Sequence, residues 1–120
     1  MTETQLVNQI LGYVRALGIF AWRQNTSGIW VHSTQSYRPS RVRGLPDILG
    51  VIPERCFILS ARCHGKMLGL EVKRPGGKAE PHQQMMLDEL RRHGAVVGVV
   101  HSWDETRMLL GESGILTRNA

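Results

Sequence analysis

The chain has 120 residues, 42% hydrophobic and 21% charged, a composition typical of a single globular domain and unlike that of a disordered chain. No apolar run is long enough to cross a bilayer, and the start lacks the pattern of a secretory signal, so we expect a cytoplasmic protein without membrane contact. A formal charge of +5 favours a polyanionic partner such as nucleic acid.

The first part of the chain predicts a helix and a short strand. Thr2 and Gln5 have the spacing of a capping box, and apolar residues then recur at helical spacing as far as Leu17. Glu3 falls in the first turn, where the sequence alone favours a role in complementing the helix dipole over a water-mediated contact with a metal. Residues 19–23 read as a short strand.

A basic segment follows at residues 29–43, and we expect it to be irregular. Three arginines flank an aromatic residue there, a pattern that suits phosphate contact and base stacking and suits a solvated loop equally well. These are Arg38, Arg41 and Arg43.

The next two apolar segments carry a candidate metal site. Asp47 follows a Gly-Leu-Pro turn at the start of an expected strand at residues 48–52. Residues 68–73 alternate with period two, which predicts a strand with Glu71 and Lys73 on one face, about 7 Å apart at their Cα atoms. We expect the following Pro-Gly-Gly turn to leave this face open to solvent.

Two carboxylates with open coordination positions suit Mg²⁺. A nearby lysine can orient or deprotonate a water, or neutralise charge that develops on a phosphate. Each motif alone is often only a strand start or a solvated ion pair. Taken together, Asp47, Glu71 and Lys73 predict metal-assisted phosphodiester hydrolysis.

The segment from residue 53 to residue 66 reads as a loop or hairpin, with a further strand at residues 56–59 as one possibility. Cys56 and Cys63 could form a disulfide or, with His64, part of a metal site. No second pair of ligands has the spacing of a zinc finger, so reduced, non-functional thiols are the favoured interpretation.

Residues 81–93 predict a helix that begins at Pro81 and ends before Gly94. Gln83 lies on its core-facing stripe and Gln84 points away. The amide of Gln83 could reach the strand-end site or could simply cap the helix. The three histidines of this half, His82, His93 and His101, read as surface or packing residues.

The end of the chain predicts a buried strand at residues 95–100 and a helix at residues 103–110. Ser102 and Glu105 have capping-box spacing at the start of that helix. Its apolar residues are a candidate dimer surface, namely Trp103, Leu109 and Leu110.

The order of these elements resembles the core of the PD-(D/E)XK nucleases, and more closely the virus-type replication-repair nuclease (VRR-NUC) family in its stand-alone form. The segment from residue 53 to residue 66 is longer than the usual link in that family. The resemblance runs along most of the chain, through Glu3, Arg23-Gln24-Asn25-Thr26-Ser27-Gly28, Gly44-Leu45-Pro46-Asp47-Ile48, Gly69-Leu70-Glu71-Val72-Lys73, Gln83 and Gly94.

This resemblance implies an α/β fold with a mixed central sheet flanked by helices. It also implies that Asp47, Glu71 and the carbonyl of Val72 bind Mg²⁺ or Mn²⁺, with Glu3 approaching through water. Lys73 would act on the attacking water, supported by Gln83. The implied partners are branched DNA, including four-way junctions, and a second copy of the chain in a homodimer.

The expected function is therefore metal-dependent cleavage of DNA by one domain that spans residues 1–120. A sequence-specific restriction-type endonuclease and a catalytically silent DNA-binding module are the alternatives. Besides the three arginines of the basic segment, we expect further DNA contacts from Arg23, Asn25, Ser27 and Lys78.

Overall fold

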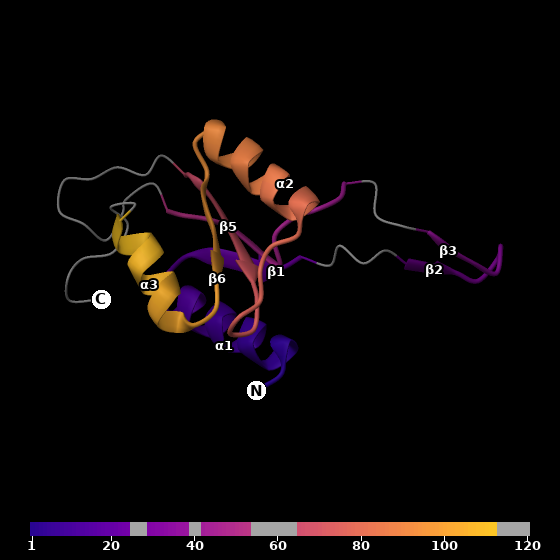
Figure 1. Ribbon diagram of the computed structural model, residues 1–120, viewed down its shortest axis with the longest axis horizontal. Helices are drawn as coiled ribbons and strands as arrows, with labels where there is room; N and C mark the ends of the chain where they lie inside the picture. The colour runs from indigo at the N-terminus through magenta and orange to yellow at the C-terminus, as the bar shows by residue number, and fades with distance from the viewer. Residues whose placement is uncertain (25–28, 39–41, 54–64, 113–120) are drawn as a thin grey trace.

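A four-stranded mixed sheet forms the centre of the molecule (Figure 1). The structure is a computed structural model, and it describes residues 1–24, 29–38, 42–53 and 65–112. The strands lie in the order β1-β4-β5-β6, with β4 antiparallel to both β1 and β5, and with β5 and β6 parallel. Their bounds are Phe20–Arg23 for β1, Ile48–Val51 for β4, Met67–Val72 for β5 and Val96–Val100 for β6.

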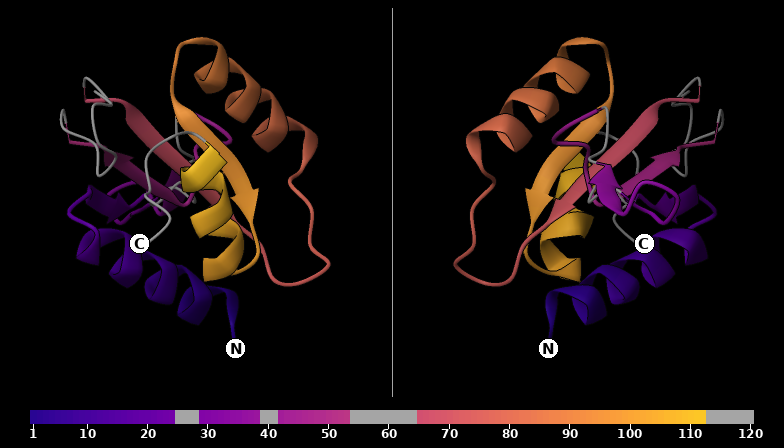
Figure 2. Two further views of the ribbon diagram at one scale, coloured as in Figure 1. Left: turned by 90° about the vertical axis from the view of Figure 1, so that its left-hand side faces the viewer. Right: turned by 90° about the vertical axis from the view of Figure 1, so that its right-hand side faces the viewer.

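Three helices cover the two faces of this sheet (Figure 2). On one face, α1 (Glu3–Ala16) and α3 (Trp103–Glu112) pack together. On the other, α2 (Pro81–Arg92) lies against β6. The α/β architecture expected from the sequence is therefore confirmed.

The first helix forms for the reasons that its sequence indicates. The hydroxyl of Thr2 accepts a hydrogen bond from the Gln5 N–H, and the Gln5 side chain accepts one from the Thr2 N–H, so the capping box is complete. The apolar stripe of α1 is buried against the sheet, with Ile10 and Val14 fully inaccessible to solvent. None of the helices in the described ranges is long and apolar enough to span a bilayer.

The basic segment differs from expectation, because part of it is a β-hairpin rather than irregular chain. Strand β2 (Ile29–Val31) pairs with β3 (Ser36–Arg38) in a separate two-stranded sheet. Figure 1 shows this hairpin extending away from the central sheet. Three residues are too few for a period-two pattern to be recognised, so the sequence gives little sign of these strands.

The last helix also corrects an expectation. Leu110 is fully buried, while Leu109 and Trp103 pack partly buried against the same core. The Trp103 ring also lies 5.0 Å from the ring of Tyr13 on α1. Leu110 is therefore used inside the chain and is not available as a dimer surface, whereas Trp103 and Leu109 are only partly buried.

Candidate active site

The register of the sheet brings the two predicted carboxylates to one end of it. Ile48 pairs with Leu70 in the antiparallel ladder of β4 and β5, so Asp47 lies opposite Glu71 just beyond the ladder. Asp47 Oδ2 accepts a hydrogen bond of 2.9 Å from the Val72 N–H. If the same pairing is continued by one more residue, Pro46 lies opposite Val72. At this position the Val72 N–H is paired with the Asp47 side chain.

Two glycines let the turn before Asp47 approach its neighbours closely. Gly44 has a φ of 80°, and a Cβ built on it would lie 2.6 Å from the carbonyl oxygen of His82 in the first turn of α2. A Cβ built on Gly69 would lie 3.0 Å from the ring of Pro46. The turn is thus pressed between β5 and the start of α2, which fixes Asp47 relative to both.

Glu71 is the buried centre of the site. It lies on the opposite face of β5 from Leu70, as the alternation predicted, but the side chain is only 2% exposed because the turn and α2 cover that face. Its Oε1 accepts a hydrogen bond of 3.0 Å from Gln83 Nε2 and lies 3.5 Å from Lys73 Nζ. Its Oε2 is buried and has no hydrogen-bond partner within the described ranges.

Gln83 combines the two roles that the sequence left as alternatives. Its Oε1 accepts a hydrogen bond of 2.8 Å from the Glu80 N–H at the start of α2, and its Nε2 donates to Glu71. The two bonds together define the orientation of the amide. Gln84 instead donates to Asp88 on the outer side of α2, so the helical register is as predicted.

Burial, followed by the neighbouring Asp47 carboxylate, raises the pKa of the Glu71 carboxyl to about 8, although Lys73 acts in the opposite direction. At Glu71, burial and the second carboxylate therefore outweigh the positive charge of the nearby Lys73. A cation placed between the two carboxylates would remove the cost of ionising both.

The donor set fits a hard divalent cation. Asp47 and Glu71 offer carboxylate oxygens, and one of these, Glu71 Oε2, is buried without a hydrogen-bond partner in the described residues. Those residues contain no group of three or more His, Cys, Asp or Glu side chains that would hold a metal. A cation here would therefore take its remaining ligands from the backbone, water and substrate, as Mg²⁺ commonly does.

The other predicted site residues lie at varying distances from this centre. Glu3 is exposed in the first turn of α1, and no hydrogen bond or ion pair within the described ranges joins it to Asp47 or Glu71. Figure 2 shows that the N-terminal end of α1 lies toward the end of the sheet where β5 and β6 finish. Arg23, Arg43 and Lys78 are exposed. The backbone of Arg38 lies in β3, whereas Asn25, Ser27 and Arg41 lie outside the described residues, as do Cys56, Cys63 and His64.

Two residues near the site were not assigned to it from the sequence, in which His101 read only as a surface or packing residue. Arg74 is exposed directly after Lys73, and its position beside the motif was the only available signal. His101 follows β6 and hydrogen-bonds the carbonyl of Gly77, 24 residues earlier, with its ring. A contact over that separation leaves no local pattern in the sequence.

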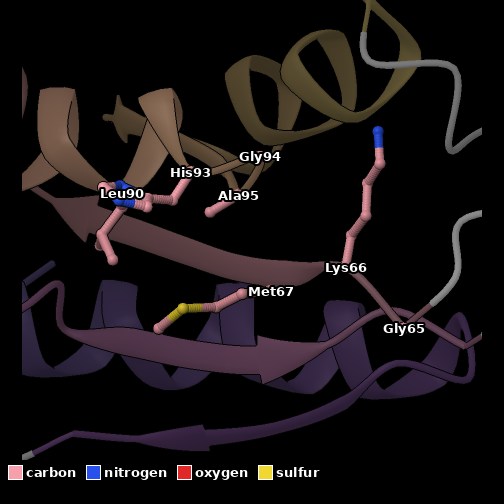
Figure 3. Close-up of a pocket in the computed structure, with 7 residues that line it drawn as sticks. All are labelled: Gly65, Lys66, Met67, Leu90, His93, Gly94 and Ala95. Carbon is pink, nitrogen blue, oxygen red and sulfur yellow. The ribbon is translucent and has the colours of Figure 1, made fainter.

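A separate hollow lies at the opposite end of the sheet, where β5 begins (Figure 3). Met67 lines it from β5, Leu90 lines it from α2, and His93 lines it from just after that helix. Apart from Lys66 and His93, its lining side chains carry no group that titrates, and it is remote from the carboxylate pair. Among the described residues, the carboxylate pair and Lys73 lie at the other end of β5.

A carboxylate pair and a lysine at the end of a mixed sheet are the arrangement of a PD-(D/E)XK-type nuclease core. A sequence profile of the VRR-NUC domain matches residues 4–104. A solved structure described as a VRR_NUC domain is 25% identical, with a TM-score of 0.60, over 92% of this chain and 97% of that chain. No curated protein matches the chain.

The chain therefore belongs to the VRR-NUC domain family and is a nuclease domain. Membership implies a DNA substrate, and nucleases of the PD-(D/E)XK type usually use a metal ion.

The raised pKa of Glu71 makes the stability of the metal-free protein depend on pH. A carboxyl group whose pKa rises from 4.5 to about 8 on folding binds its proton more tightly in the folded state, so stability falls as pH rises between those values. We expect Glu71→Gln to raise the free energy of unfolding at pH 7 by on the order of 3 kcal/mol, with little change at pH 4.

Urea denaturation at both pH values, in the presence of EDTA, measures this effect. Glu89→Gln, an exposed change on α2, serves as the control and should show the same pH dependence as the unaltered protein. Added Mg²⁺ should stabilise the unaltered protein at pH 7 and stabilise the Glu71→Gln variant much less. Equal pH dependence in all three proteins would show that Glu71 ionises normally.

Proposed function

We propose that this chain is a divalent-metal-dependent DNA endonuclease that acts on branched DNA and resolves four-way junctions as a homodimer. One observation carries the catalytic part of the proposal. Glu71 is buried beside Asp47, Lys73 and Gln83 at the end of the sheet, and one of its carboxylate oxygens is left without a hydrogen-bond partner in the described residues.

In this proposal Asp47, Glu71 and the carbonyl of Val72 hold Mg²⁺ or Mn²⁺, with Glu3 acting through water. The cation would supply the positive charge that stabilises the scissile phosphate and acidifies the attacking water. Lys73 orients that water or neutralises charge on the phosphate. Gln83 holds the Glu71 carboxylate in place through its Nε2, while its Oε1 fixes the start of α2.

The proposals of a junction substrate and of a dimer are supported by a symmetry argument. Resolution of a four-way junction requires two cuts related by an approximate two-fold axis, and one domain with one such site makes one cut per encounter. A C₂ dimer places two equivalent sites on a matching axis. A homodimer is thus the assembly that one site per chain requires for this substrate.

A substrate panel tests the proposal. Duplex, flap, splayed-arm and four-way-junction DNA are incubated with Mg²⁺, Mn²⁺ or EDTA, and the nicks are mapped on each strand. We expect paired nicks on opposing strands of the junction, no cleavage in EDTA, and a dimer by light scattering. Cleavage at one duplex sequence would favour a restriction-type enzyme. Junction binding without cleavage would favour a silent module, and a monomer that prefers flaps would overturn the junction assignment.

The basic segment offers a separate prediction about DNA affinity. No acidic residue occurs between Arg23 and Asp47, and the hairpin lies in this interval. Replacing the three arginines of the basic segment by glutamine should weaken DNA binding. It should also reduce the slope of log K, the DNA association constant, against log salt concentration by roughly 0.9 per lost phosphate contact. The variant is Arg38→Gln/Arg41→Gln/Arg43→Gln.

A matched triple variant removes the same charge elsewhere, from arginines on α2 and α3 that pair with acidic side chains. It should leave the salt dependence nearly unchanged. Fluorescence anisotropy with a labelled junction, in EDTA, measures both variants. Equal slopes for the two would mean that the three arginines of the basic segment are merely solvated. The control is Arg91→Gln/Arg92→Gln/Arg107→Gln.

A further inference from the structure

The side chain of His101 joins two elements at the end of the sheet that carries the site. The residue follows β6, and its ring lies between the segment after Lys73 and the first turn of α3. Its Nε2 is 2.7 Å from the carbonyl oxygen of Gly77, and its Nδ1 is 3.1 Å from each carboxylate oxygen of Glu105. Glu105 also accepts a hydrogen bond of 3.0 Å from the His101 backbone N–H.

The chemistry of these two partners defines the protonation state that the arrangement requires. A backbone carbonyl and an ionised carboxylate both accept hydrogen bonds and donate none. A neutral imidazole carries a single N–H and can satisfy one of the two partners, whereas an imidazolium satisfies both. The contacts around His101 are therefore complete only when the ring is doubly protonated.

The segment tied by His101 connects two groups of the candidate active site. It runs from Lys73 to Glu80, just before Gln83, and most of its side chains are exposed. At its start the Lys73 N–H donates to Val100, and at its end the Glu80 N–H donates to Gln83. Between these two hydrogen bonds, the bond from the His101 ring to the Gly77 carbonyl joins the middle of the segment to the end of β6.

Gly77, which accepts the hydrogen bond from His101, also packs against Lys73. A Cβ built on Gly77 would lie 3.1 Å from the Cβ of Lys73, so the backbone at position 77 is packed directly against the root of that side chain. The Gly77 N–H also donates 2.8 Å to the carbonyl of Arg74, which closes the turn. A displacement of Gly77 would free space beside the Lys73 Cβ.

We propose that His101, in its doubly protonated form, is a positioning residue that holds the Lys73–Glu80 segment against the sheet and thereby confines the Lys73 side chain next to Glu71. The predicted effect on cleavage rests on the function proposed for Lys73. The tie itself does not, because it consists of contacts between His101, Gly77 and Glu105.

The charges around His101 set the direction of its pH response. The carbonyl of Gly77, followed by the carboxylate of Glu105, raises the pKa of His101 above its ordinary value of 6.5. A raised pKa in the folded state means that the tie contributes fully below pH 6.5 and is lost as pH rises through the folded pKa. The charged groups on the surrounding elements are Glu105 and Asp104 on α3, Glu3 on α1, and Lys73, Arg74, Lys78 and Glu80 in the tied segment.

Nuclear magnetic resonance of the full chain in EDTA tests the tie without reference to nuclease activity. We expect ¹⁵N shifts of the His101 ring to report two protonated nitrogens at pH 6. Hydrogen exchange at the amides of the tied segment, corrected for intrinsic rates, should accelerate as the ring titrates. In His101→Ala it should be fast at every pH. Unchanged exchange in this variant, or a neutral ring at pH 6, would overturn the proposal.

Two further variants distinguish a pH-dependent tie from general structural support. Glu105→Gln keeps a hydrogen-bond acceptor beside the His101 ring but removes the negative charge that raises the pKa of the ring. The amides of the tied segment should therefore lose their protection from hydrogen exchange at a lower pH than in the unaltered protein. His93→Gln changes an exposed histidine at the other end of the sheet and should alter neither exchange nor its pH dependence. A Glu105→Gln profile that matched the unaltered protein would contradict the role of the charged pair.

Single-turnover cleavage of a four-way junction with Mg²⁺ then connects the tie to Lys73. His101→Ala should slow the cleavage step by roughly 10- to 100-fold with little change in DNA affinity. His93→Gln should cleave normally. Loss of affinity with an unchanged rate would overturn the link to Lys73. Absence of cleavage by the unaltered protein would contradict the proposed junction cleavage alone, because the exchange data decide the tie independently.

Discussion

Asp47→Asn and Glu71→Gln should each reduce junction cleavage by roughly 10³-fold or more while DNA binding persists. Either change leaves one carboxylate in a site whose described acidic ligands number two, and a single carboxylate holds Mg²⁺ poorly. The amide variants are the sharper test, because Asp47 also accepts the Val72 N–H. Alanine at position 47 would leave that buried donor unpaired, at a cost of about 1–3 kcal/mol in stability.

Single-turnover nicking with Mg²⁺ measures the loss, and thermal unfolding verifies that each variant is folded. Asp104→Asn is the matched control, since this carboxylate is exposed on α3 and pairs only with Arg107 among the described residues. It should cleave at the rate of the unaltered protein. Wild-type rates from either site variant would refute the metal assignment.

Lys73→Met should slow the cleavage step by roughly 10²- to 10³-fold and change the affinity for DNA little. The ammonium lies 3.5 Å from Glu71 at the end of β5, and its contribution is expected to be greatest in the transition state. Lys66→Met, at the opposite end of the same strand, is the control. A Lys73 variant whose only defect is weaker binding would show that this lysine merely contacts phosphate.

The same assay ranks the two adjacent glutamines. Gln83→Leu removes both the bond to Glu71 and the bond to the Glu80 N–H, so we expect slower cleavage and a less stable start of α2. Gln84→Leu removes only the contact with Asp88 on the outer side of the helix and should cleave normally. The reverse ranking would contradict the proposed role of Gln83.

Local patterns in the sequence were sufficient to place most of these groups. Period-two alternation puts Glu71 and Lys73 on one face of a strand, and helical periodicity puts Gln83 on the inner stripe of α2. Both inferences depend only on residues close together in the chain. Each inference is correct if the predicted strand or helix is present, and both β5 and α2 are present in the structure.

The features that the sequence did not reveal depend on contacts between distant segments. Glu71 was expected at a solvent-exposed strand end, yet it is buried because Gly44 and Gly69 admit the Pro46 turn against α2 and β5. The role of His101 depends on a carbonyl 24 positions earlier in the chain. Neither close approach has a periodic signature, so neither could be read from composition or spacing.

The hydrogen bond between the Gln24 N–H and the Asp47 carbonyl, 2.7 Å long, has an evolutionary consequence. It brings the end of β1 next to the start of β4, so the chain between them leaves the sheet and returns to the same place. Doubling the length of such an excursion costs only about 0.6 kcal/mol in closure entropy. The β2–β3 hairpin can therefore be lengthened, trimmed or exchanged between relatives while the carboxylate pair stays in register, which makes it the part of the fold best able to diversify.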